Sequence, residues 1–301
     1  MWRGVIVGIA AIVLMTTVTP LNAEEVRIKH AGLTLNGVLT IAEGKAPDAG
    51  VVMIVHGTLA HNTMDTISNL NDVLVERGLN TLAINLSLGI DDRHGMYDCQ
   101  TLHRHRHLDA LDEIDAWLAW LKKRNFGPVT LLGHSRGGNQ VARFAAERPH
   151  SMIERLVLMA PATWNADGAA KGFEKRHGRP LAGVLKKAST FIEAGQGHKV
   201  MAKTGLLYCT GADVTAASFQ SYYRPHPRFD TPTILAEISV PTLVVAAGKD
   251  TVVRGLPERV APLTKPGKIE LSVVDDADHF FLDLFAEDVA DAIEEFLSAG
   301  I

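Results

Sequence analysis

The stretch Thr130-Leu-Leu-Gly-His-Ser-Arg-Gly-Gly138 leads from an apolar run of strand length into a helical pattern. Within it, the spacing Gly-x-Ser-x-Gly places Ser135 between two glycines. A serine on a sharp strand-to-helix turn requires such neighbours, because the flanking segments approach closely and leave no room for side chains. A phosphate-binding loop is the competing interpretation, but the Gly-Lys-Ser/Thr ending of such loops is missing. The stretch therefore predicts a serine hydroxyl exposed at the carboxyl edge of a sheet.

The rest of the chain alternates apolar runs of strand length with segments whose apolar residues recur every three or four positions. The expected strands are 26–29 and 33–41, paired as a hairpin, followed by 50–57, 81–86, 129–132, 153–159, 241–247 and 271–274. The expected helices are 66–77, 108–124, 139–147, 257–263 and 287–297. This alternation predicts an α/β fold with a doubly wound, mostly parallel sheet. We expect residues 163–237, between two of the strands, to form an inserted cap.

Composition narrows the class of protein. The 301 residues are 47% hydrophobic, enough for one large core or two modest ones. Lys and Arg number 30 against 34 Asp and Glu, a net charge of −4, and no sustained basic run is present. Nothing here indicates a nucleic-acid-binding protein, so a globular enzyme is the default expectation.

The N-terminus has the layout of a secretory signal peptide. Arg3 precedes the uncharged stretch 4–23, which is apolar at first and then rich in Thr, with Pro20 near its end. We expect a signal peptide over residues 1–23, cleaved after Ala23, which leaves a domain of residues 24–301 exported to the periplasm or secreted. An uncleaved membrane anchor is the alternative, because an uncharged stretch of this length nearly spans a bilayer.

Two later segments follow expected strands and extend the pattern around Ser135. They are Gly248-Lys-Asp250 and Asp275-Asp-Ala-Asp-His279-Phe-Phe281. Together with Gly133-His134-Ser135-Arg136-Gly137, they resemble the α/β-hydrolase superfamily, in which the triad order is Ser, acid, His. The resemblance runs from about Val26 to Leu297, interrupted by the cap, and implies the α/β-hydrolase fold.

The resemblance also implies a role for each residue. Ser135 is the expected nucleophile, His279 the general base and then acid, and Asp250 the carboxylate that orients the imidazole. The backbone N–H groups of Arg136 and Thr58 are the expected oxyanion hole. This machinery implies cleavage of a carboxylic ester through an acyl-enzyme, with no cofactor and no metal. Because a general base must be neutral, we expect hydrolysis to fall below about pH 6 to 7.

Several alternatives remain open for these residues. Asp275, Asp276 and Asp278 are closer to His279 in sequence than Asp250 is. His56 and His134 are interpreted as structural neighbours of the site. The same machinery serves thioesterases, peptidases and acyltransferases, and a hydrolase-like binding protein without turnover is the non-enzymatic alternative.

A histidine-rich segment invites a metal hypothesis. It reads Cys99-Gln-Thr-Leu-His103-Arg-His105-Arg-His107, with His94 upstream. In a helix His103 and His107 share one face, as zinc-binding pairs do. The intervening arginines add positive charge where a cation would lie, so we favour a solvated helix that begins at Thr101 or a nearby residue. A contribution to the rim of the pocket is a further alternative.

The cap is basic and contains one of the two cysteines. Residues 163–203 hold 8 Lys and Arg against 3 Asp and Glu, a charge of 8 minus 3, or +5. Solvated helix faces explain this charge most simply; the alternative is weak attraction to anionic substrates or envelope lipids. Aromatic side chains could line the pocket or pack the cap: Trp164, Phe173, Phe219, Tyr222 and Tyr223. An oxidising compartment permits a Cys99–Cys209 disulfide, and two separate buried thiols are the alternative.

Overall fold

The computed structural model describes residues 22–299. The expected signal peptide falls almost wholly outside that range and stays a prediction. The strands are β1 (Asn22–His30), β2 (Leu33–Ile41), β3 (Val51–Val55), β4 (Thr81–Asn85), β5 (Val129–His134), β6 (Ile153–Met159), β7 (Val200–Met201), β8 (Val214–Thr215), β9 (Thr242–Ala247) and β10 (Ile269–Val274). The α-helices are α1 (Asp65–Glu76), α2 (Asp109–Lys123), α3 (Arg136–Glu147), α4 (Ala166–His177), α5 (Leu181–Glu193), α6 (Ala216–Tyr223), α7 (Leu256–Val260) and α8 (Leu284–Ser298). The short 3-10 helices are η1 (Pro47–Ala49), η2 (Pro227–Phe229), η3 (Thr231–Thr233), η4 (Leu235–Glu237) and η5 (Ala261–Leu263).

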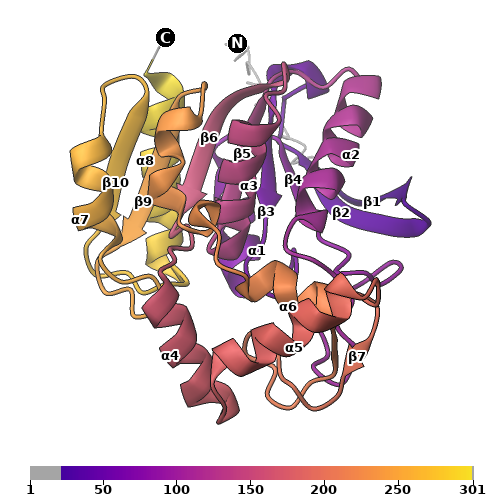
Figure 1. Cartoon of the computed structure of the whole chain (residues 1–301). Coiled ribbons are helices and arrows are strands. Elements are labelled where there is room, and N and C mark those ends of the chain that lie inside the picture. The colour runs from indigo at the N-terminus through magenta and orange to yellow at the C-terminus, as the bar shows by residue number, and fades with distance from the viewer. Residues whose placement is uncertain (1–21, 300–301) are drawn as a thin grey trace, which may run out of the picture.

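Eight strands form one sheet in the order β1-β2-β4-β3-β5-β6-β9-β10. β1 and β2 pair antiparallel, as does β2 with β4, whereas the pairs from β4 through β10 are parallel. Each residue of the central strands β3 and β4 is buried, because helices cover both faces of the sheet. The predicted mostly parallel, doubly wound sheet is confirmed, including the N-terminal hairpin (Figure 1).

Each face of the sheet has its own core. One core packs Trp117 of α2, Phe144 of α3 and Leu256 of α7 against the strands. The other packs Leu70 of α1 and Ile293 of α8 against the opposite face. In α2, for example, the buried residues Ile114, Trp117 and Leu121 recur every three or four positions, so the helix presents one apolar stripe to the sheet and a polar side to water.

The segment between β6 and β9 lies across the carboxyl ends of the strands, at the bottom of Figure 1, and contains α4, α5, α6 and the small β7-β8 sheet. It has a third core, in which Phe173 and Phe219 pack against Leu59 and Tyr97 of the sheet-edge loops. α4 begins where the Asn165 side chain accepts a hydrogen bond from the N–H of Gly168 and ends at Gly178, whose φ is 67°. The cap therefore packs directly on the edge of the sheet where Ser135 lies.

Among residues 22–299, none of the helices is both long and apolar enough to cross a membrane.

Candidate active site

Ser135 occupies the turn between β5 and α3. Its φ of 55° and ψ of −118° lie outside the regions that a serine ordinarily adopts. The turn is held by two hydrogen bonds: the Ser135 N–H donates to Met159 O at 2.9 Å, and its carbonyl accepts from Ala162 N at 2.8 Å. The surrounding strands thus fix a strained backbone that presents the hydroxyl above the sheet edge.

The glycines around Ser135 are required by close backbone approach. A Cβ on Gly133 would lie 2.5 Å from Gly137 O, and one on Gly137 would lie 2.4 Å from His56 O. Real Cβ atoms do not approach backbone oxygens so closely. The neighbouring main chain therefore fills the space that a side chain at either position would need, as the sequence pattern predicted.

Three side chains from different loops meet at this turn. His279 Nε2 lies 2.9 Å from Ser135 Oγ, and His279 Nδ1 lies 2.7 Å from Asp250 Oδ2. The His279 and Asp250 side chains are only 5% and 3% exposed, so water barely competes for their hydrogen bond. Asp250 follows β9 and His279 follows β10, which brings both to the edge where β5 ends.

Asp250 is held as a carboxylate by its surroundings. Burial alone raises its pKa, but hydrogen bonds from His279 and from the N–H groups of Val252 and Val253 outweigh burial, so the pKa lies below its usual range. The rival acids are occupied elsewhere: Asp276 pairs with Lys249, and Asp278 accepts from the N–H of Phe280. Of the four aspartates considered, only Asp250 bonds His279.

A cavity of about 360 Å³ opens beside Ser135 and His279. Thr58 and Arg136, the expected oxyanion-hole residues, line it together with Gly57. Within the described part of the chain, neither the Thr58 nor the Arg136 N–H donates to another main-chain group or side chain. Two unpaired donors thus flank the serine. A larger groove of about 860 Å³ lies among α2, α3 and α6, but Ser135 is not part of its lining.

Arg93, which the sequence analysis missed, anchors the loop that contains Thr58. Its guanidinium is buried and donates to Ala60 O at 2.8 Å, to Asn85 Oδ1 at 2.7 Å and to His56 Nε2 at 3.1 Å. Burial, reinforced by Arg93, lowers the pKa of His56 to about 3, so the ring is neutral and its Nδ1 donates to Gly57 O. Arginine is usually exposed, and no sequence signal marked this one as buried.

The histidine-rich segment does not form the expected solvated helix. Residues 101–107 form a loop ahead of α2, and His103, His105 and His107 are all buried beneath the cap. His103 bonds His105, His105 bonds Tyr222, and His107 bonds Asn139, so the rings point toward different partners. The solvated-helix prediction was wrong because the cap covers this segment: the His103 N–H donates to Asp213 O, and His103 O accepts from Thr215 N.

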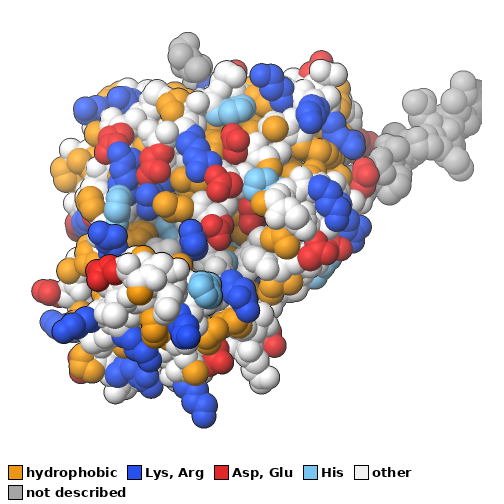
Figure 2. All heavy atoms as spheres, turned by 45° about the vertical axis from the view of Figure 1, so that its right-hand side comes forward, with side chains coloured by type: hydrophobic (Ala, Val, Ile, Leu, Met, Phe, Trp, Pro, Cys, Tyr) orange, Lys and Arg blue, Asp and Glu red, His pale blue; other side chains and the backbone are white. Residues whose placement is uncertain are grey.

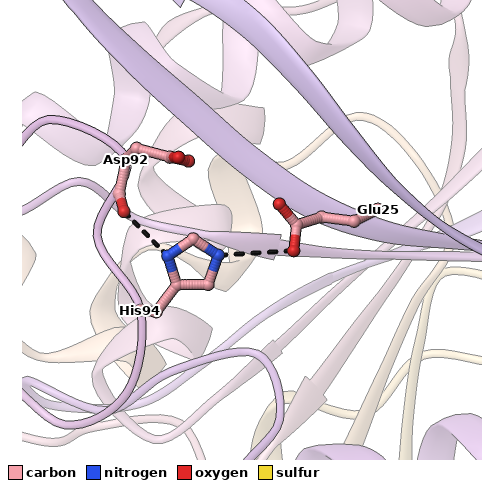
Figure 3. Close-up of side chains that lie close together, drawn as sticks. All are labelled: Glu25, Asp92 and His94. Carbon is pink, nitrogen blue, oxygen red and sulfur yellow. Dashed lines mark hydrogen bonds and ion pairs between the residues drawn. The ribbon is translucent and has the colours of Figure 1, made fainter.

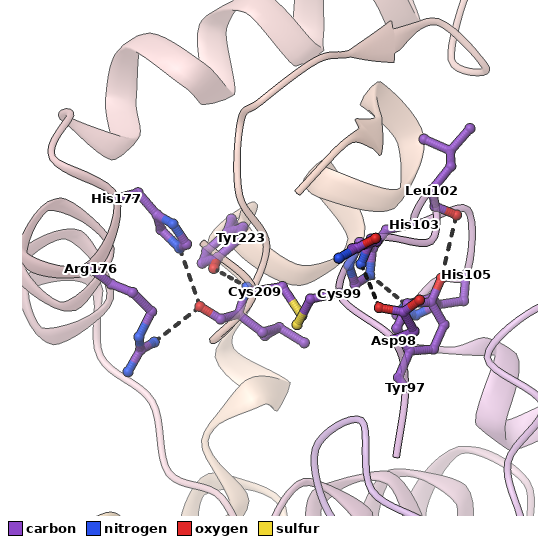
Figure 4. The surroundings of a disulfide bond; sticks show 12 residues. Tyr97, Asp98, Cys99, Leu102, His103, His105, Arg176, His177, Cys209 and Tyr223 are labelled. Atoms are coloured by element: carbon purple, nitrogen blue, oxygen red, sulfur yellow. Dashed lines mark hydrogen bonds between the residues drawn. A yellow bond between two sulfur atoms is a disulfide. The ribbon is translucent and has the colours of Figure 1, made fainter. Parts of the chain in front are cut away.

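Cys99 and Cys209 form a disulfide between the loop after β4 and the cap, with a Cα–Cα distance of 5.2 Å (Figure 4). The cap loop is also held at Leu207, whose carbonyl accepts from Arg176 and His177 and whose N–H donates to the Tyr223 hydroxyl. Leu207 and Tyr208 line the cavity beside Ser135, so these bonds fix one wall of the site.

One cluster among the described residues has metal-ligand chemistry: Glu25, Asp92 and His94 (Figure 3). His94 Nδ1 faces the Asp92 carbonyl oxygen at 2.8 Å, and Nε2 faces Glu25 at 3.3 Å. Each ring nitrogen thus already faces an oxygen atom, and Arg27 pairs with both carboxylates, so a cation here would have to displace existing interactions. The cluster is best described as ion pairs that fasten β1 to a loop.

Comparison with known proteins gives a family. Residues 51–292 match the profile of the alpha/beta hydrolase family. Est1E from Butyrivibrio proteoclasticus is 19% identical with a TM-score of 0.62, covering 91% of this chain and 97% of its own. The Pyrococcus furiosus esterase Pf2001 is 18% identical with a TM-score of 0.61, covering 94% and 95%. Alpha/beta hydrolase domain-containing protein 10 from mouse is 16% identical with a TM-score of 0.60, covering 91% and 98%.

No curated protein matches the chain. At these identities the solved structures demonstrate a shared fold, and the family profile, which covers most of the sequence, agrees with them. The chain therefore belongs to the alpha/beta hydrolase family.

Proposed function

We propose that this protein is a serine hydrolase that cleaves a carboxylic ester through an acyl-enzyme. The hydrogen-bonded series Ser135, His279, Asp250 is the observation that carries the proposal. Membership of a hydrolase family and the esterases among the structural neighbours support the same class of reaction. One of those neighbours, Est1E, has been solved with ferulic acid bound, which favours a small-molecule ester as the substrate here.

In the proposed mechanism, Ser135 Oγ attacks the ester carbonyl carbon while His279 Nε2 takes the hydroxyl proton. Asp250 accepts the Nδ1–H of His279, which selects the tautomer with a basic Nε2 and stabilises the imidazolium once it forms. The Thr58 and Arg136 N–H groups stabilise the negative charge on the carbonyl oxygen. His279 then protonates the departing alcohol, and water releases the acid by the reverse sequence of proton transfers.

The kinetic test compares wild type with Ser135→Ala on short 4-nitrophenyl esters. We expect kcat/KM to fall by at least about 10³-fold, because the remaining rate comes from binding and the oxyanion donors alone. Equal turnover by the two proteins would contradict the mechanism. Products analysed with an added alcohol, thiol or amine acceptor distinguish hydrolysis from acyl transfer, which the same machinery could perform.

Export of the protein stays part of the proposal. The sequence pattern of residues 1–23 supports it, and the Cys99–Cys209 disulfide is of a kind that persists in oxidising compartments. N-terminal sequencing of the protein recovered from the periplasm or the medium checks the cleavage after Ala23. Recovery of the full chain in the membrane fraction would favour the anchored alternative.

A further inference from the structure

A second cavity, of about 210 Å³, lies under the cap next to the one beside Ser135. The two cavities share three lining residues, Arg136, Arg176 and Leu207. Trp164, Phe173 and Tyr222 supply aromatic walls for the second cavity. A substrate held at Ser135 can therefore extend past two guanidinium groups into an aromatic chamber.

Arg136 has no acidic partner among residues 22–299. Its Nε donates to Thr58 Oγ1 at 3.1 Å, and its guanidinium carbon lies 5.4 Å from the centre of the Tyr222 ring. The hydroxyl and the aromatic face orient the cation but do not neutralise it. Burial lowers the pKa of Arg136. Even so, a guanidinium stays protonated at neutral pH.

Arg176 reaches the same space from α4. It donates to Leu207 O at 3.1 Å and forms no salt bridge within residues 22–299. Neighbouring arginines differ: Arg143 pairs with Glu147, and Arg259 pairs with Asp230. No Asp or Glu among the described residues lines either cavity. Within the described residues, both guanidinium groups therefore face the cavities without a carboxylate beside them.

We propose that the site is selective for esters whose acid or alcohol portion bears a second, anionic group, such as a carboxylate, sulfate or phosphate, bound by Arg136 and assisted by Arg176. This proposal rests on the proposed ester hydrolysis. Leaving a half-buried guanidinium without a counterion is unfavourable, and an anionic substrate removes that cost on binding. The unshared donors of a guanidinium match the paired oxygens of such groups.

The charge of the cap favours the same class of substrate. The segment 163–203, which forms part of the lining of the second cavity, has a charge of +5, whereas the whole chain is at −4. In Figure 2 the lower part of the molecule, which the cap forms, shows more blue than red side chains. A positive charge on the cap raises the local concentration of anions near the site, an effect that salt weakens.

The test uses two pairs of esters. Mono-(4-nitrophenyl) glutarate against 4-nitrophenyl butyrate places the anion on the acyl side, and 4-carboxyphenyl butyrate against phenyl butyrate places it on the alcohol side. For each protein, kcat/KM for the anionic ester is divided by that for its neutral partner. Comparing this ratio between wild type and variant cancels both the intrinsic reactivity of the esters and the fraction of active protein.

We expect the ratio to fall by about 10- to 100-fold in Arg136→Gln for at least one pair, as for loss of a hydrogen bond to a charged group. Arg176→Gln should lower it less, because Arg176 is exposed and water screens its charge. Arg179→Gln is the matched control: it removes the same charge three residues away, outside both cavities, and should leave the ratio unchanged.

Failure of this inference is distinguishable from failure of the proposed function. If neutral esters turn over in a Ser135-dependent way but Arg136→Gln leaves both ratios unchanged, the anion site is wrong and ester hydrolysis stands. If no ester is hydrolysed, calorimetric titration of glutarate decides: weaker binding in Arg136→Gln than in wild type supports the anion site, and equal or absent binding overturns it.

Discussion

At the sheet edge, a Cβ added to Gly133 or Gly137 would lie within 2.5 Å of a backbone oxygen. In the cap helices, a Cβ added to Gly172 or Gly183 would meet no neighbouring segment within 4 Å. The first region is fixed by main chain packed against main chain. The cap is fixed by a disulfide, by hydrogen bonds to Leu207 and by a small core of its own. The difference indicates that the sheet edge around Ser135 tolerates little change in its main chain, whereas the cap helices have room for larger side chains.

The largest expected effect is on the sheet edge. Asp250→Asn keeps the shape of the side chain but removes the charge that selects the His279 tautomer, so we expect kcat to fall by about 10⁴-fold. Asp276→Asn is the control, because Asp276 is exposed and pairs with Lys249 rather than His279. Steady-state kinetics on a short ester measure both; a similar loss in the two variants would contradict the assignment of Asp250.

Removing the disulfide tests what holds the cap. Because Cys99 and Cys209 are 110 residues apart, we expect the double change to alanine to lower the free energy of unfolding by about 2 to 5 kcal/mol. Urea denaturation of oxidised wild type against the variant measures the loss. The effect on KM should exceed that on kcat, since Leu207 and Tyr208 form a wall of the cavity rather than the reacting centre. Unchanged stability would show that the bridge does not restrain the cap.

Two alanine substitutions compare the regions directly. Gly137→Ala forces a Cβ against His56 O and Val55 O, so we expect a loss of about 3 kcal/mol in stability, together with loss of activity. Gly172→Ala, inside α4, meets no atom and should raise stability by up to about 1 kcal/mol through helix propensity. Thermal and urea unfolding of both variants measure these changes. Equal effects on stability at the two positions would contradict the difference between the sheet edge and the cap.

Acid should destabilise the sheet edge through its buried histidines. Burial, with Arg93, lowers the pKa of His56 to about 3, and burial, with His279, lowers that of His134 to about 4. The unfolded chain takes up these protons near pH ~6.5 but the folded chain does not, so stability is lost as the pH falls below that value. At pH 5 we expect a loss of roughly 2 kcal/mol from each ring. Urea unfolding at pH 7, 6 and 5 measures this, and a free energy that stays constant would refute it.

Much of this molecule follows from local sequence pattern. The apolar runs predict the bounds of the strands of the large sheet to within a few residues. The glycines around Ser135 indicate the tight turn, because close backbone approach requires them. The expected helix at 139–147 is the latter part of α3, which begins directly after Ser135. A local pattern suffices where neighbours in sequence determine the structure.

The predictions that fail, and the residues that were missed, concern positions whose structure depends on segments far away in the sequence. Residues 101–107 have the composition of a solvated helix, yet the cap, more than 100 residues later, buries them and pairs with their main chain. The sequence around Arg93 does not distinguish it from an exposed loop arginine. Its burial depends on acceptors from Asn85, His56 and Ala60, which only the fold brings together. Pairing Arg136 and Arg176 in one cavity likewise depends on the position of α4, which no local pattern specifies.

Covalent trapping of the nucleophile tests the central claim most directly. The mature protein is treated with a fluorophosphonate, digested, and mapped by mass spectrometry, with heat-unfolded protein and Ser135→Ala as controls. The account predicts one modified residue, Ser135, in the folded wild type and none in either control. Modification of a different residue, or persistent ester turnover by protein that the reagent does not label, would contradict it.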